Sequence, residues 1–174
     1  MFKKPTNDMA RAQLLFAEHV ADDWALVTAG TKDSYNTMTI GWGSAGTLWS
    51  TPVVSVFVHP RRYTHRFLER ESHFCVQTFD DKYHRDLAIL GSKSGRDQDK
   101  VALTSLTPVA YEHTMGFAEA RVTLVCRKVY THHMDLAAVP DEVRKHFSGR
   151  GDLYAREAHT VFVGEVVWAE VREG

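Results

Sequence analysis

Polar, aromatic and glycine residues concentrate in one stretch of this chain, residues 36–52, which reads NTMTIGWGSAGTLWSTP. Its first residues favour a strand, and Gly41, Gly43 and Gly46 then leave backbone amides without side-chain cover. Such a surface suits a flat ligand rich in heteroatoms; the alternative is that the glycines form a barrel corner and the aromatic side chains fill the core. The hydrogen-bonding and aromatic residues of the stretch are Asn36, Thr37, Thr39, Ser44, Trp42 and Trp49.

A second stretch, residues 91–100, combines the groups that bind phosphate. Its sequence, GSKSGRDQDK, contains serines, glycines and basic residues, so hydroxyls, backbone amides and cations can converge on one anion. It is not a P-loop, because it lacks a Gly-Lys-Ser/Thr triplet at the required place. Taken alone, the stretch favours the alternative, a solvated loop in which Asp97 and Asp99 neutralise the cations.

A third stretch, residues 59–67, reads HPRRYTHRF and predicts a helix that opens on Thr64. Thr64 at a helix start, with Arg61 and Arg62 before it, would add amides and cations to an anion site. The alternative is that Thr64 is an N-cap and the arginines are surface charges. The stretch by itself favours the N-cap.

The histidines give two further hypotheses. His132 and His133 lie near Asp135, but neighbouring residues of a strand point to opposite faces, so we predict no metal site there. His159 precedes the last predicted strand, where the rim of a barrel would lie. It is therefore either a ligand contact or a solvent-exposed loop histidine.

The composition limits the classes of protein to consider. A chain of 174 residues, 44% of them hydrophobic, predicts one domain over residues 1–174. With 21 basic and 22 acidic residues, its net charge of -1 argues against nucleic acid or an anionic membrane as a partner. Cys75 and Cys126 lie in apolar runs, which predicts reduced thiols and a cytoplasmic protein. We expect no signal peptide and no membrane span.

Hydrophobic periodicity predicts at least six strands joined by short helices. There is no regular strand-helix-strand alternation and no glycine fingerprint of a dinucleotide-binding sheet, so an antiparallel barrel, closed or partly open, is the predicted fold. We expect helices over 8–22, from Thr64 and from Pro140, a helical region with a loop over 80–104, and strands over 24–30, 36–42, 53–60, 73–79, 117–133 and 160–171.

Three segments in order, 36–64, 94–100 and 159–166, resemble the flavin reductase-like family, the FMN-binding split barrels that include flavoredoxins and NAD(P)H:flavin oxidoreductases. This resemblance implies a mainly β fold with short helices, an antiparallel split barrel of the Greek-key type. It also implies FMN held without a covalent bond at the interface of a homodimer.

The resemblance extends to single residues. It implies that the isoalloxazine ring is bordered by Asn36, Met38, Thr39 and Trp42, with Ser44 close by. It implies that the phosphate and ribityl chain are held by Thr64, Ser94, Arg96 and Lys100. It also implies that His159 is the catalytic residue, near the flavin's reactive face or edge.

The implied function is that of an FMN-dependent oxidoreductase, a flavin reductase that takes electrons from NADH or NADPH and passes them to free flavin, an acceptor protein or a small acceptor. One alternative is a flavoredoxin-like electron carrier without nicotinamide activity of its own. Another is a barrel that has lost flavin and binds a different ligand. The segment between Cys126 and His159 is longer than in compact family members, which predicts a reshaped nicotinamide or acceptor pocket.

Overall fold

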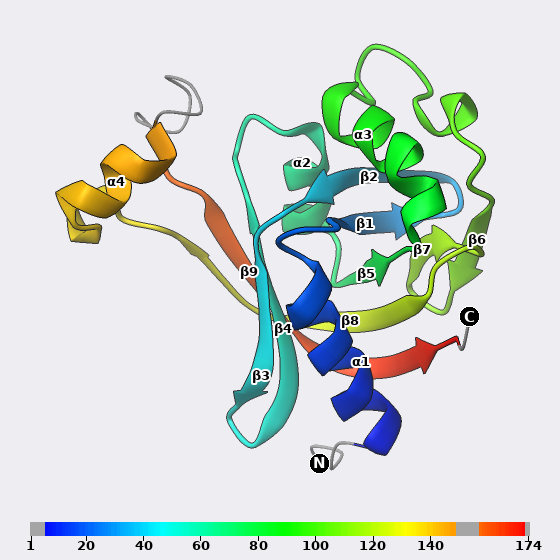
Figure 1. Ribbon diagram of the computed structural model, residues 1–174, viewed down its shortest axis with the longest axis horizontal. Coiled ribbons are helices and arrows are strands. Elements are labelled where there is room, and N and C mark those ends of the chain that lie inside the picture. The colour runs from blue at the N-terminus through cyan, green and yellow to red at the C-terminus, as the bar shows by residue number, and fades with distance from the viewer. Residues whose placement is uncertain (1–5, 149–156, 173–174) are drawn as a thin grey trace.

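The computed structural model describes residues 6–148 and 157–172, which form a curled antiparallel sheet with helices around it (Figure 1). Seven strands make this sheet, in the order β2-β1-β5-β8-β9-β4-β3, and β6 and β7 pair separately. The strands are β1 (Ala25–Thr31), β2 (Ser34–Ile40), β3 (Gly43–Leu48), β4 (Thr51–Val58), β5 (His73–Thr78), β6 (Pro108–Tyr111), β7 (Thr114–Phe117), β8 (Val122–His133) and β9 (Thr160–Val171). The helices are α1 (Asn7–His19), α2 (Tyr63–Arg70), α3 (His84–Ser92) and α4 (Asp141–Ser148), with short 3-10 turns η1 (Asp81–Tyr83), η2 (Val101–Leu103) and η3 (Leu136–Ala138).

The two edges of the curled sheet, β2 and β3, are consecutive in the chain. Only Gly41 and Trp42 separate them, so the backbone itself crosses the gap between the edges. No ladder joins β2 to β3 within 6–148 and 157–172, the part of the chain that the structure describes. The barrel is therefore split, which confirms the predicted fold class.

Helix α1 packs into the base of the barrel. Its buried residues Met9, Ala12 and Phe16 belong to the main core, whereas Leu14 on the opposite side of the helix is 73% exposed. The ring of Phe16 lies so close to Gly43 that a Cβ atom there would be 2.6 Å from its Cζ. Glycine at the start of β3 thus allows α1 to seat against the seam of the barrel.

Strand β1 is buried on both faces, which explains its unbroken apolar run. Val27 belongs to the main core inside the barrel, and its neighbour Leu26 packs in a second cluster with Leu87 and Leu90 of α3. Alternate side chains of a strand point to opposite faces, so both sides of β1 are covered by apolar groups. Helix α3 is consequently fixed against the outside of the barrel.

The C-terminal end of β8 and the N-terminal end of β9 extend from the barrel and carry α4 (Figure 1). The β8–β9 ladder shifts register between Val125 and Cys126 and again between Lys128 and Tyr130, as β-bulges do where strands bend. We call residues 130–148 and 157–163 the arm. It belongs to the long segment that the sequence singled out, of which residues 149–156 lie outside the described part.

Several element boundaries differ from the prediction. The expected strand 117–133 is shorter at its start, since β7 ends at Phe117 and β8 begins only at Val122. The hairpin of β6 and β7 was not predicted, because its strands are only four residues long and one begins with proline. Helix α4 begins one residue after Pro140, whose carbonyl accepts a hydrogen bond from the Arg144 amide.

Cys75 and Cys126 are both free and buried, as the sequence predicts, and burial raises the pKa of both thiols.

Within the described residues, none of the helices combines the length and the apolar character needed to cross a membrane.

Candidate functional site

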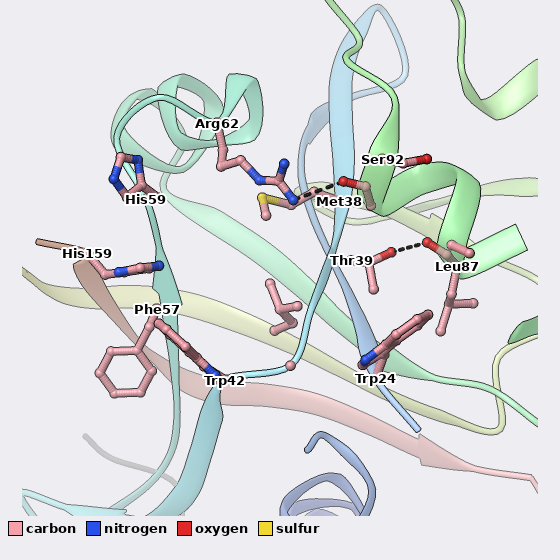
Figure 2. Close-up of a pocket in the computed structure, with 14 residues that line it drawn as sticks. Trp24, Met38, Thr39, Trp42, Phe57, His59, Arg62, Leu87, Ser92 and His159 are labelled. Atoms are coloured by element: carbon pink, nitrogen blue, oxygen red, sulfur yellow. Dashed lines mark hydrogen bonds between the residues drawn. The ribbon is translucent and has the colours of Figure 1, made fainter. Parts of the chain in front are cut away.

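A cavity of about 390 Å³ opens beside the link between β2 and β3, and we call it the ring pocket. Trp42, Phe57 and His159 lie on one side of it, and Trp24 and Leu87 lie on the other (Figure 2). Its walls are mostly flat rings and aliphatic groups. The space therefore suits a planar ligand, which is one of the two alternatives that residues 36–52 leave open.

A smaller cavity of about 170 Å³, the anion pocket, adjoins the ring pocket. The two cavities share Met38, Arg62, Gly91 and Ser92. None of the described residues that line the anion pocket is acidic, which makes it a strongly cationic site. The basic residues that line it are Arg61, Arg62, Lys93, Arg96 and Lys100.

Asn36 and Thr64 meet at the floor of the anion pocket. The Asn36 amide donates a 2.7 Å hydrogen bond from Nδ2 to the Thr64 hydroxyl, and both residues are buried. The prediction that Thr64 opens and caps α2 is wrong, because the helix begins at Tyr63 with Arg62 at the N-cap position. The Thr64 hydroxyl instead points inward, where Asn36 of β2 supplies a donor.

Gly95 passes close over Asn36. A Cβ atom at position 95 would lie 2.1 Å from Asn36 Oδ1 and 3.4 Å from the Tyr63 ring. Only a residue without a side chain lets the loop after α3 approach β2 and α2 so closely. The loop 91–100 is therefore packed onto the barrel as a wall of the anion pocket.

Lys100 is buried beneath this loop, with 4% of its surface exposed. Its Nζ donates hydrogen bonds to the carbonyls of Leu90, at 2.7 Å, and Lys93, at 3.2 Å. Burial, with a smaller contribution from Arg62, lowers the pKa of Lys100 to about 8. The ammonium thus holds the end of α3 against the loop while it lines the anion pocket.

The acidic residues of the loop lie outside the anion pocket. Asp99 caps the turn η2, accepting hydrogen bonds from the amides of Val101 and Ala102, and neither Asp97 nor Asp99 lines the anion pocket. The loop is largely exposed, as the stretch taken alone favours, but its carboxylates lie outside the pocket that its cations line.

Arginine side chains border the two cavities. Arg62 Nη2 donates a 2.9 Å hydrogen bond to the Gly91 carbonyl, which holds its guanidinium where the cavities meet (Figure 2). Arg96 lies over the Tyr63 ring, 5.3 Å from the centroid, and Ser94 accepts a hydrogen bond from the Arg96 amide. Ser94, Arg96 and Lys100, three of the predicted phosphate contacts, thus line one pocket.

His159 and Trp42 form one wall of the ring pocket. Their ring centroids are 4.7 Å apart, and the ring of His59 stands edge-on to His159 at 5.3 Å. Burial, followed by the charges of His59 and Arg62, lowers the pKa of His159 to about 4. His159 is therefore a neutral imidazole near pH 7 and does not act there as a protonated general acid.

Two residues of β2 face the ring pocket from its floor. Met38 lines both cavities, and the Thr39 hydroxyl donates a 2.5 Å hydrogen bond to the Leu87 carbonyl, which ties β2 to α3 (Figure 2). Trp24, across the cavity, has a φ of 66° and stacks on His84 with centroids 4.3 Å apart. A left-handed backbone is uncommon for tryptophan, so packing holds this ring at the pocket.

Ser44 is the predicted site residue that the structure places elsewhere. It lies exposed on the edge strand β3 and does not line the ring pocket or the anion pocket. Several lining residues were not among the predicted site residues, including Trp24, Phe57, His59 and Gly95, whereas Arg62 was considered only as part of the stretch before Thr64. The signal available for Arg62 was its place just before Thr64, and that for Gly95 its place within the loop 91–100.

The fold places the chain in the class of split β-barrels. It belongs to the family described as "Flavin reductase like domain", whose model matches residues 17–174.

Solved structures of similar fold include three informative ones. A flavoredoxin from Methanosarcina acetivorans is 23% identical, with a TM-score of 0.67, over 87% of this chain and 69% of that one. An FMN-binding domain of a flavin reductases-like enzyme from Shewanella baltica is 18% identical, with a TM-score of 0.66, over 92% and 73%. Nitrilotriacetate monooxygenase component B from Bacillus cereus is 19% identical, with a TM-score of 0.67, over 99% and 81%.

Proposed function

We propose that this protein is an FMN-dependent oxidoreductase, a flavin reductase that takes electrons from NADH or NADPH. The observation that carries the proposal is the junction of a flat aromatic pocket with a cationic one through Met38, Arg62, Gly91 and Ser92. FMN has the matching parts, a planar ring system joined by a short chain to a phosphate. The ring pocket, of about 390 Å³, fits the planar ring system in volume. The smaller, cationic anion pocket, of about 170 Å³, fits the phosphate in volume and in charge.

The residues present divide the work of binding. The cations of the anion pocket supply charge-assisted hydrogen bonds to the phosphate. Asn36 and Thr64 lie beneath them, where a ribityl hydroxyl would find both donors and acceptors. Met38 and Trp42 supply the apolar surface against which an isoalloxazine ring would lie.

When bound, FMN itself supplies the electron transfer, and the chain positions it and sets the polarity around it. Arg62 places a positive charge beside a ring that gains negative charge on reduction. Neutral His159 and Trp42 close the opposite wall and limit access of water. In this proposal His159 contacts the reacting ring without having to deliver a proton.

The visible absorption spectrum of the purified protein tests the proposal. With FMN added, recorded before and after anaerobic addition of NADH and then NADPH, the bound flavin should bleach within the time of turnover. If the bound flavin stays oxidised, the protein is not a reductase but an electron carrier, which a separate protein reduces. A protein that binds no FMN would refute both.

We also propose a homodimer. Leu48, Trp49 and Tyr130 are exposed, and the Trp49 and Tyr130 rings lie 6.3 Å apart between the β3–β4 hairpin and the arm. Exposed apolar groups beside an unpaired edge strand are typical of a protein interface. Light scattering should give twice the monomer mass, and a monomer at all concentrations would contradict this assembly.

The proposed place of action is the cytoplasm, which the two free buried thiols of Cys75 and Cys126 support.

A further inference from the structure

A third cavity, of about 480 Å³, lies between the barrel and the arm, and we call it the arm pocket. Gly41, Trp42, Phe57 and His159 line both this cavity and the ring pocket. The paired rings of Trp42 and His159, with centroids 4.7 Å apart, are thus a wall common to both. A molecule in the arm pocket would lie next to whatever fills the ring pocket.

The arm supplies the outer side of this cavity. Met134, Leu136, Val139 and Val143 line it from the arm, opposite the end of α1. A barrel without the arm would lack these four apolar side chains and present an open surface. The long segment after β8 therefore builds a binding site that the barrel alone would not have.

The arm pocket has no basic residue among the described residues that line it. Its one carboxylate, that of Glu157, lies 3.3 Å from Arg61 Nε, so the guanidinium compensates its charge. The volume is within the range of about 300–1,000 Å³ that is usual for small-molecule sites. A dinucleotide or a free flavin phosphate would find no cation among the described residues that line this cavity, in contrast to the anion pocket.

We propose that the arm pocket binds the electron acceptor, an uncharged and largely apolar molecule of one or two rings such as a quinone. The proposal rests on the proposed flavin function, which supplies the electrons. For a quinone, one NAD(P)H and one proton from water would give NAD(P)⁺ and the hydroquinone, so two electrons and two protons reach the acceptor oxygens. Trp42 and His159, which line both cavities, would lie between the flavin ring and the acceptor ring.

The test uses menadione, an uncharged two-ring quinone, and isothermal titration of the FMN-loaded protein. Val139→Asp places a carboxylate on the apolar side of the arm pocket, at a half-buried residue that does not line the ring pocket or the anion pocket. Menadione should bind the wild-type protein, and the variant should bind it about tenfold or more weakly, because the carboxylate would lose water against an apolar ligand. Ala138→Asp adds the same charge at an exposed neighbouring residue outside the pocket and should leave the affinity unchanged.

Two further measurements separate this proposal from the flavin function. The Kd for FMN and the KM for ferricyanide, a charged acceptor, should be the same in all three proteins. Repeating the menadione titration without FMN, followed by quenching of tryptophan fluorescence, tests the arm pocket even if the protein proves unable to bind flavin. Leu136→Asp, at another half-buried residue of the arm pocket, should reproduce the effect of Val139→Asp if that variant folds poorly.

Equal menadione affinity in the wild-type protein and both pocket variants would overturn the proposal, as would no menadione binding at all. The proposal would also be overturned if Val139→Asp converted a dimer to a monomer in light scattering without changing menadione affinity. A second copy of the chain would then be the occupant of the arm pocket.

Discussion

At the scale of single residues, Lys100 connects FMN binding to pH. Its pKa of about 8 in the free protein lies below the usual value because the ammonium is buried. Below pH 8 the cation that would hold the phosphate is already present; above pH 8 the protein must first take up a proton. We therefore expect the Kd for FMN to rise above pH 8, by at most about tenfold per pH unit.

Riboflavin is the matched ligand for this measurement, since it carries the same ring without the phosphate, and its affinity should not show this rise. Lys100→Gln should abolish the pH dependence and weaken FMN binding by about 1.5–3 kcal/mol. Lys32→Gln, which removes a charge from an exposed turn, serves as the control variant. Fluorescence titration of FMN between pH 6 and about 10 gives all of these values, and a flat profile for the wild-type protein would remove Lys100 from the phosphate site.

His159 links stability to acid pH. Its pKa is about 4 when folded and about 6.5 in an unfolded chain, so the unfolded state binds more protons between these values. The contribution of neutral His159 to folding is thus complete above pH 6.5 and is lost as the pH falls toward 4. His59 and Arg62, which face it, act in the same direction.

Urea denaturation at several pH values checks this for the wild-type protein and for His159→Gln. The difference in free energy of unfolding between them should shrink as the pH falls from about 7 to about 4.5, because the variant has no imidazole to protonate. A difference that stays constant over this range would show that His159 titrates normally in the folded protein. Burial lowers the pKa of His65 and His73 as well, but both proteins keep these residues.

The sequence was informative about which residues form the site and uninformative about how they divide their roles. Asn36, Thr64 and Lys100 do line one pocket. What spacing could not indicate is that Thr64 turns away from its helix terminus toward Asn36, or that Lys100 also binds the carbonyls that end α3. Such pairings depend on residues 28 and 10 positions apart, respectively, and arise only when the sheet and helices pack.

At the scale of elements, the loop 91–100 must lie flat on β2 for the anion pocket to exist. Gly95→Ala would place a methyl group 2.1 Å from Asn36 Oδ1, so either the loop or the Asn36 side chain has to move. We expect weaker FMN binding with little change in the binding of lumiflavin, which has the ring but neither the ribityl chain nor the phosphate, because the displacement affects the anion pocket and not the ring pocket. Gly46→Ala is the matched control, since nothing lies within 4 Å of a Cβ atom there. If both variants bind FMN equally well, the loop is not held as the structure indicates.

Strand β3 shows why local sequence misses some elements. Its residues GSAGTL are weak strand formers and mostly exposed, and it pairs through β4, whose apolar residues anchor the hairpin. Trp49 and Ser50 at the turn both have positive φ, 51° and 59°, a conformation usually adopted by asparagine and glycine. By contrast β9, a nearly continuous run of apolar and β-branched residues, was predicted with its observed bounds of Thr160 and Val171.

At the scale of the whole molecule, the pockets follow from the split in the barrel. Where β2 passes into β3, no ladder among the described residues fills the seam, and the link at Gly41 and Trp42 borders both the ring pocket and the arm pocket. The seam is stabilised from within by α1, whose Phe16 contacts Gly43 just beyond Trp42. Packing at the base of the barrel and the shape of the site are therefore coupled.

Phe16→Ala tests this coupling. Removing a fully buried ring should lower the free energy of unfolding by about 3–5 kcal/mol. Leu14→Ala, on the same helix but 73% exposed, should change it by no more than about 0.5 kcal/mol. Because the cavity left by Phe16 would free the link that carries Trp42, we also expect Phe16→Ala to weaken riboflavin binding at a temperature where the variant is folded. Urea denaturation and fluorescence titration measure the two effects separately; a loss of stability with unchanged riboflavin affinity would confine α1 to a structural role.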